Sequence, residues 1–159
     1  MIALILVFVA ALLKTLQLFY EDSEQMQFEA TLERLDRSIN SLVAEHVAKG
    51  DLQGLAAYRH TNPMQLLSSE NHNYLGEFSQ GTQTVAPASW YFNRTYRQLS
   101  YQLRDASSAK QGGGQTGEIS FKLRLKYQDN NHNERYDRGV DHVSGLALEP
   151  VYPYQWLAP

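Results

Sequence analysis

The segment 119–141 constrains the fold of this chain more than any other. Its first nine residues alternate strictly between two kinds of side chain. The apolar set comprises Ile119, Phe121, Leu123, Leu125 and Tyr127, and the polar or cationic set between them comprises Ser120, Lys122, Arg124 and Lys126. Because successive side chains of a strand point to opposite faces, this pattern predicts a strand with one buried face and one cationic, solvated face. A polar loop follows, and the chain returns through a second apolar segment at 144–157. We therefore expect a strand–loop–strand unit at the centre of the folded domain.

Composition narrows the function classes. The 159 residues carry 14 basic and 17 acidic side chains, a net charge of -3, and no basic block, so we expect no nucleic-acid partner. Cysteine is absent, which excludes thiolate metal sites, disulfides and cysteine catalysis. The five histidines lack the spacing of a helical zinc site, and no nucleophile-elbow motif occurs. We therefore expect a protein that is not an enzyme.

The N-terminal segment is strongly apolar. Residues 2–13 are continuously apolar, but as a helix they span only about 18 Å, less than the roughly 30 Å of a bilayer core. Apolar residues resume after Lys14, and the segment counted to Tyr20 spans about 28 Å. A cleaved signal peptide, a buried core helix and a single-pass anchor are the three interpretations. We favour the anchor and assign residues 1–20 as a membrane-spanning apolar segment.

An amphipathic helical stem is predicted for residues 21–58. Apolar side chains recur there in alternating steps of four and three: Phe28, Leu32, Leu35, Ile39 and Leu42. This spacing places them on one face of a helix that continues without a break to about residue 49. The stripe packs either on the protein's own domain or on another helix, and these five residues are therefore the candidate partner-binding residues.

The remaining residues, 59–159, are predicted to form a β-rich domain. Asp51 and Asn62 are placed to cap two short helical segments. The glycine- and proline-interrupted segment 68–88 is predicted to be an ordered loop, and the glycine-rich segment 105–117 a flexible connection between strands. The expected fold class is α+β: a long N-terminal, partly transmembrane helix packed on an antiparallel sheet of about four strands.

The loop at 129–141 has oxygen-bearing side chains at the spacing of a calcium loop. Positions 1, 3, 5 and 9 are occupied and position 7 offers a carbonyl: Asp129, Asn131, Asn133, Asp137 and Arg135. Two departures are Glu134 where the sharp turn normally has glycine, and Val140 where a bidentate glutamate is normal. The two interpretations are a weak Ca²⁺ site and a hairpin loop whose Asx side chains bond the backbone. No other cofactor is expected.

Three groups of residues resemble a known family. They are 62–67 (NPMQLL) with 73–77 (NYLGE), 89–93 (SWYFN), and 121–129 (FKLRLKYQD) with 153–156 (PYQW). In this order, after an apolar N-terminal segment, they resemble the MshF-type biogenesis proteins of the mannose-sensitive haemagglutinin (MSHA) type IV pilus. More broadly the chain is similar to minor pilins and pseudopilins, which implies a pilin-like fold.

The resemblance implies a role in type IV pilus assembly. It implies a single-pass protein of the bacterial inner membrane, with a periplasmic C-terminal domain at 59–159 and association with the pilus. Its partners are expected to be other pilin-like or pilus-assembly membrane proteins, bound without catalysis. The glycine, the aromatic residue or methionine after it, and the early glutamate of processed pilins are absent near Met1, and the first acidic residue is Glu21. The chain is therefore expected either to be an unprocessed assembly component or to begin upstream of Met1. The alternative function is a calcium-responsive adhesin domain at the pilus tip or cell surface.

Overall fold

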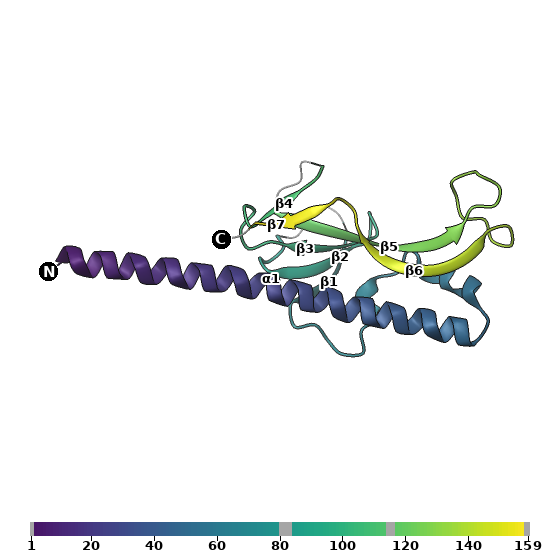
Figure 1. The fold of residues 1–159 in the computed structure, drawn as a ribbon, viewed down its shortest axis with the longest axis horizontal. Coiled ribbons are helices and arrows are strands. Elements are labelled where there is room, and N and C mark those ends of the chain that lie inside the picture. The colour runs from purple at the N-terminus through teal and green to yellow at the C-terminus, as the bar shows by residue number, and fades with distance from the viewer. Residues whose placement is uncertain (1, 80–83, 114–116, 158–159) are drawn as a thin grey trace.

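One long helix, α1, lies along a face of a β-sheet and projects beyond it at the N-terminal end (Figure 1). The structure, a computed structural model, describes residues 2–79, 84–113 and 117–157. The helical elements are α1 (Ile2–Ala48) and two 3-10 helices, η1 (Leu52–Tyr58) and η2 (Pro63–Leu66). The strands are β1 (Tyr74–Phe78), β2 (Ser89–Asn93), β3 (Gln98–Gln102), β4 (Ala109–Gln111), β5 (Glu118–Gln128), β6 (His142–Pro150) and β7 (Tyr154–Trp156).

The main sheet is mixed and has five strands in the order β1-β2-β3-β5-β6. Strand β1 is parallel to β2, whereas the other three pairs are antiparallel. Strands β4 and β7 pair separately as a small antiparallel sheet. The predicted fold class, with an antiparallel sheet of about four strands, is therefore wrong. The reason is that β1 lies in the segment predicted as a loop and adds a fifth strand, which pairs in parallel with β2.

The predicted membrane segment is also wrong. Within the described ranges 2–79, 84–113 and 117–157, no helix combines the length and the apolar character that crossing a membrane requires. The purely apolar run ends at Leu13, and Lys14 follows it. The expectations of a membrane-spanning segment at 1–20 and of a single-pass inner-membrane protein are therefore overturned.

Several local predictions are confirmed. The apolar face of β5 is buried in its first half, with Ile119 at 0%, Phe121 at 3% and Leu123 at 5% exposure. On the face predicted to be solvated, Arg124 and Lys126 are exposed, but Ser120 is buried at 2% and bonds Ser100, so that part of the prediction is wrong. Asp51 caps η1 through the backbone N–H of Gly54, and Asn62 caps η2. These predictions hold because each depends on neighbours in the sequence, either the alternation of a strand or a cap beside its own helix.

The core is organised around Phe28 of α1, which is fully buried. Its ring stacks on Trp90 of β2 at 5.1 Å between centroids and meets Tyr101 of β3 edge-on at 5.0 Å. Tyr154 and Trp156 of β7 contact it edge-on at 5.7 and 5.3 Å. Such offset and edge-to-face arrangements are favourable beyond the area that they bury. One helix residue therefore joins both sheets.

A buried carboxylate fixes the helix beside this cluster. Glu24, one turn before Phe28, accepts hydrogen bonds from the Tyr101 hydroxyl at 3.2 Å and from the backbone N–H of Arg104 at 2.9 Å. Burial, followed by the negative charge of Glu24, raises the pKa of Tyr101. The hydroxyl therefore stays protonated and remains a donor to Glu24, which sets the register of α1 on β3.

Replacing Phe28 with alanine is expected to lower the free energy of unfolding by about 3–5 kcal/mol, because it leaves a cavity among several rings. The matched control is Met26→Ala on the same helix, where the side chain is 70% exposed and the expected change is within about 0.5 kcal/mol. Chemical denaturation of the two variants measures the difference. Equal losses in both would contradict the central role of Phe28.

Candidate functional site

Among the described side chains, a run of exposed large apolar residues lies on the projecting part of α1 (Figure 1). Its exposed large side chains are Ile5, Val7, Phe8, Val9, Leu12 and Leu13, with exposures from 43% to 70%. Val7, Phe8 and Val9 are consecutive and point in three directions, since successive helix residues are rotated by about 100°. A helix that is apolar on several sides is normally buried, so this segment, called here the apolar arm (residues 5–13), is a candidate binding surface.

The predicted partner-binding stripe lies elsewhere and faces the protein's own sheet. Phe28 and Leu35 are fully buried, and Ile39 is 2% exposed. Leu32 and Leu42 are partly buried and pack against the same two core clusters. Of the two alternatives for this stripe, the structure shows packing on the domain.

The loop at 129–141 is held by its own hydrogen bonds. The Asp129 carboxylate accepts from the backbone N–H groups of His132 and Glu134, both at 2.7 Å. The Asp137 carboxylate accepts from the side-chain amides of Asn131 at 2.8 Å and Asn133 at 2.5 Å. These bonds account for the loop conformation through the Asx chemistry that the sequence suggested as one alternative.

The predicted calcium ligands are thus brought together, but the side chains of Asp129, Asn131, Asn133 and Asp137 already accept hydrogen bonds within the loop. The Asn133 side-chain oxygen accepts from the backbone N–H of Arg135 at 2.8 Å. Glu134, at the position normally held by glycine, adopts a left-handed conformation with φ 61°. Among the residues that the structure describes, no group of three or more His, Asp or Glu side chains could hold a metal ion. Calcium binding by this loop stays a prediction.

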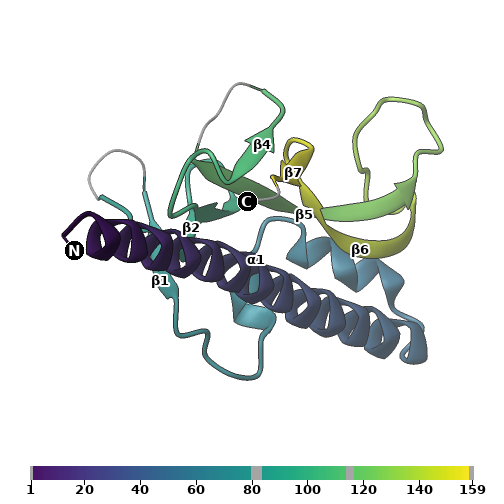
Figure 2. The same ribbon diagram turned by 60° about the vertical axis from the view of Figure 1, so that its left-hand side comes forward.

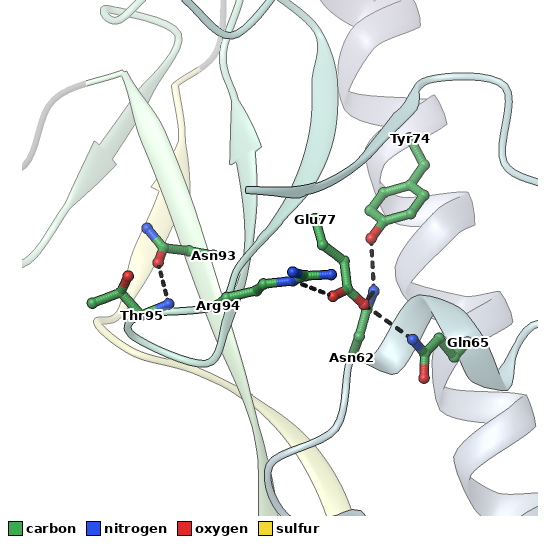
Figure 3. Close-up of polar contacts among 7 residues, drawn as sticks. All are labelled: Asn62, Gln65, Tyr74, Glu77, Asn93, Arg94 and Thr95. Carbon is green, nitrogen blue, oxygen red and sulfur yellow. Dashed lines mark hydrogen bonds and ion pairs between the residues drawn. The ribbon is translucent and has the colours of Figure 1, made fainter. Parts of the chain in front are cut away.

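A polar cluster that sequence reasoning missed joins η2, β1 and the β2–β3 turn (Figure 3). Glu77 of β1 is its centre, accepting from Asn62 and Gln65, both at 3.0 Å, and pairing with Arg94 at 2.8 Å. Asn62, which is 4% exposed, also donates to the Tyr74 hydroxyl at 2.6 Å. The cluster holds the parallel strand β1 against its neighbours and fixes the turn after β2.

Hydrogen bonding governs the charge state of this cluster. The hydrogen bond from Asn62, followed by that from Arg94, lowers the pKa of Glu77. Burial raises the pKa of Tyr74, so the phenol stays protonated. No local sequence signal identifies this cluster, because its members come from three segments and each one alone is typical of a surface residue. Its hydrogen bonds and ion pair connect η2, β1 and the β2–β3 turn.

Comparisons of this chain with known protein families, with characterised proteins and with solved structures found no significant match.

Glu77→Ala is expected to lower the free energy of unfolding by about 1.5–3 kcal/mol at pH 7, because it removes a charged hydrogen-bond acceptor from a buried amide and an arginine. The folded-state pKa of Glu77 is depressed. The stabilisation by the Glu77 carboxylate is therefore present above the pKa of about 4.3 that glutamate has in the unfolded chain. It is lost as the pH falls through the lower pKa of the folded state. The difference between wild type and variant should shrink strongly at pH 3, as measured by urea denaturation at both pH values.

The control is Glu33→Ala, which removes an exposed carboxylate from α1. It is expected to change stability by less than about 0.5 kcal/mol at either pH. A Glu77→Ala penalty that stays constant between pH 7 and pH 3 would show that packing, and not the charge of Glu77, is responsible.

Proposed function

We propose that this protein is a non-catalytic component of type IV pilus assembly of the MSHA type, and that it acts by protein–protein interaction through its apolar arm. The resemblance in residues 62–157 supports a role of this protein in the pilus system. The exposure of the apolar arm supports the mode of action. The occupant of this surface is a set of apolar helices from pilin-like partner subunits.

The apolar arm is the observation that carries the proposal. The side chain of Phe8 is 69% exposed and that of Val7 is 70% exposed, whereas the core residues Phe28 and Leu35 of the same helix are fully buried. Fully burying one such side chain is worth about 1.5–3 kcal/mol, so six of them provide a large driving force for association. A surface of this kind on a folded protein marks an interaction site.

Among the described side chains of α1, those buried against the folded head lie in the later part of the helix. The first buried residue of α1 among those described is Glu24, and the buried stripe continues through Phe28, Leu35 and Ile39. The sheet is therefore packed by the later part of α1, whereas the large side chains of the arm described above are exposed. This division of labour within one helix favours a binding role for the N-terminal part.

The distribution around the helix favours several partner helices over one. A neighbouring helix contacts a single stripe, whereas Val7, Phe8 and Val9 point in directions about 100° apart. Covering all three requires helices on more than one side. Apolar helices gathered in a bundle meet this requirement, and pilin-like subunits supply such helices.

The double variant Val7→Glu with Phe8→Glu is expected to lose binding of pilin-like subunits, because each substitution places a charge in an apolar interface. A loss of at least about 1.5 kcal/mol for each side chain corresponds to more than about tenfold weaker binding for each. The measurement is co-purification of tagged full-length protein, with pilin-like subunits quantified by mass spectrometry, together with surface piliation of cells that carry the variant.

The matched control is Met26→Glu, which alters an equally exposed apolar residue on the same helix outside the arm. Both proteins should keep the wild-type melting temperature, since neither site contributes to the core. Normal piliation in cells lacking the gene, or equal subunit recovery with both variants, would refute the proposal.

A further inference from the structure

The second half of β5 has a strand on only one side. Its pairing with β3 ends at Leu99↔Phe121, whereas its pairing with β6 continues to Gln128↔His142. Figures 1 and 2 show β5 and β6 extending past the other strands of the main sheet as a two-stranded ribbon. Within the described parts of the chain, no strand pairs with the other edge of β5 beyond Phe121.

The direction of the backbone groups identifies what this edge offers. The Gly117 carbonyl accepts from Leu103 N–H, on the β3 side, and the Ser120 carbonyl accepts from Val151 N–H, on the β6 side. The N–H and C=O groups of successive strand residues point to alternate edges of the strand. Those of the odd-numbered residues of β5 therefore point toward the β3 side. The N–H and C=O groups of Leu123 and Leu125 therefore point to the open edge. Such an edge is a template for an added strand.

A groove of about 640 Å³ lies along this edge. The β2–β3 turn bounds it with Arg97, the segment after η1 with Arg59, and the loop after β5 with Arg135. Lys122 and Arg124 of β5 also line it. Five of the 14 basic side chains of a chain with net charge -3 thus meet in one groove.

Among the described residues, Arg97 and Lys122 lie within 4.0 Å of no carboxylate oxygen, whereas Arg124 lies 3.2 Å from Glu149. Among the same residues Arg135 forms no such close pair, but, after hydrogen bonds from two loop asparagines, its positive charge contributes to lowering the pKa of Asp137. The acidic residues in the lining are Glu134 and Asp137.

Two further contacts describe the electrostatics of the groove. The guanidinium carbon of Arg59 lies 5.7 Å from the centroid of the Tyr136 ring, a cation–π contact. Burial, followed by the positive charges of Arg97, Arg59 and Lys122, lowers the pKa of His60 in the same groove.

We propose that the open edge of β5 binds an extended acidic segment of a partner protein, which adds to the sheet as a strand at Leu123 and Leu125. The added strand would present alternate side chains to two environments. One face meets the apolar side of β5, where Leu123 and Tyr127 lie, and the other meets the cations of Lys122 and Arg124. The partner segment therefore alternates apolar and acidic residues.

Charge complementarity selects this occupant. A second copy of the same edge would bring Lys122 and Arg124 against their own counterparts, which disfavours self-pairing. An acidic segment neutralises the groove while its backbone satisfies the edge. The site lies at the end of the head away from the apolar arm (Figure 1), so it is independent of the function proposed above.

The test uses the full-length chain and a labelled heptapeptide in which glutamate and valine alternate. Anisotropy measures its affinity, and amide hydrogen exchange by NMR locates it. We expect binding that weakens as salt rises from about 0.05 to 0.5 M, because the contacts are partly electrostatic. We also expect slower exchange at the N–H groups of Leu123 and Leu125, since an added strand would bond them.

Two comparisons separate strand addition from general attraction of anions. Methylating alternate backbone nitrogens of the peptide keeps its charge but removes donors, and should weaken binding roughly tenfold. Arg97→Glu with Lys122→Glu should weaken the unmodified peptide by tenfold or more, whereas the control Lys110→Glu, an exposed cation on β4, should leave the affinity unchanged.

The outcomes that overturn the proposal are specific. No binding at millimolar peptide, or binding without protection of Leu123 and Leu125, would exclude strand addition. Equal affinity for the methylated peptide or for inorganic polyphosphate would show a general anion site. Sedimentation that shows a dimer, with Leu123 and Leu125 already protected in the absence of peptide, would assign the edge to a second copy of this chain.

Discussion

The packing of one helix residue, Phe28, against rings from several strands holds the folded head together. Trp90 and Tyr101 approach it from the main sheet, and Tyr154 and Trp156 from the small one. Because the ring is fully buried, α1 is fixed in position and rotation at this point. The direction of the helix in turn decides which of its residues lie against the sheet and which project beyond it.

The long helix thereby divides the molecule into two surfaces with different chemistry. At one end the apolar arm presents exposed aliphatic and aromatic side chains, among them Val7, Phe8 and Leu13. At the other end β5 and β6 extend past the other strands as a ribbon (Figure 2). The backbone groups on the open edge of β5 lie beside the cations that line the groove. An apolar surface favours broad packing between helices, whereas a charged strand edge favours a particular sequence pattern. The two proposals therefore concern different partners and stand separately.

Local patterns account for the elements that could be predicted. The alternation in β5 and the caps of Asp51 and Asn62 depend on residues close in the sequence. Strand β1 could not be predicted this way: its burial is intermediate and its pairing with β2 is parallel. It is kept in place by the contacts of Glu77 with Asn62 and Arg94, which lie 15 and 17 residues away. The predicted loop at 68–88 and the predicted antiparallel sheet were wrong for this reason.

The sequence by itself specified the apolar run at 2–13, the apolar stripe that follows it in α1, the alternation of β5 and the candidate ligands of the loop at 129–141, because each is a pattern of neighbours or of fixed helical and strand periods. Tertiary structure alone decided that the stripe packs on the protein's own sheet, that β1 enters that sheet in parallel, and that cations from four separate segments line one strand edge. These outcomes depend on which surfaces meet, and side chains distant in the sequence meet only when the chain has folded around Phe28.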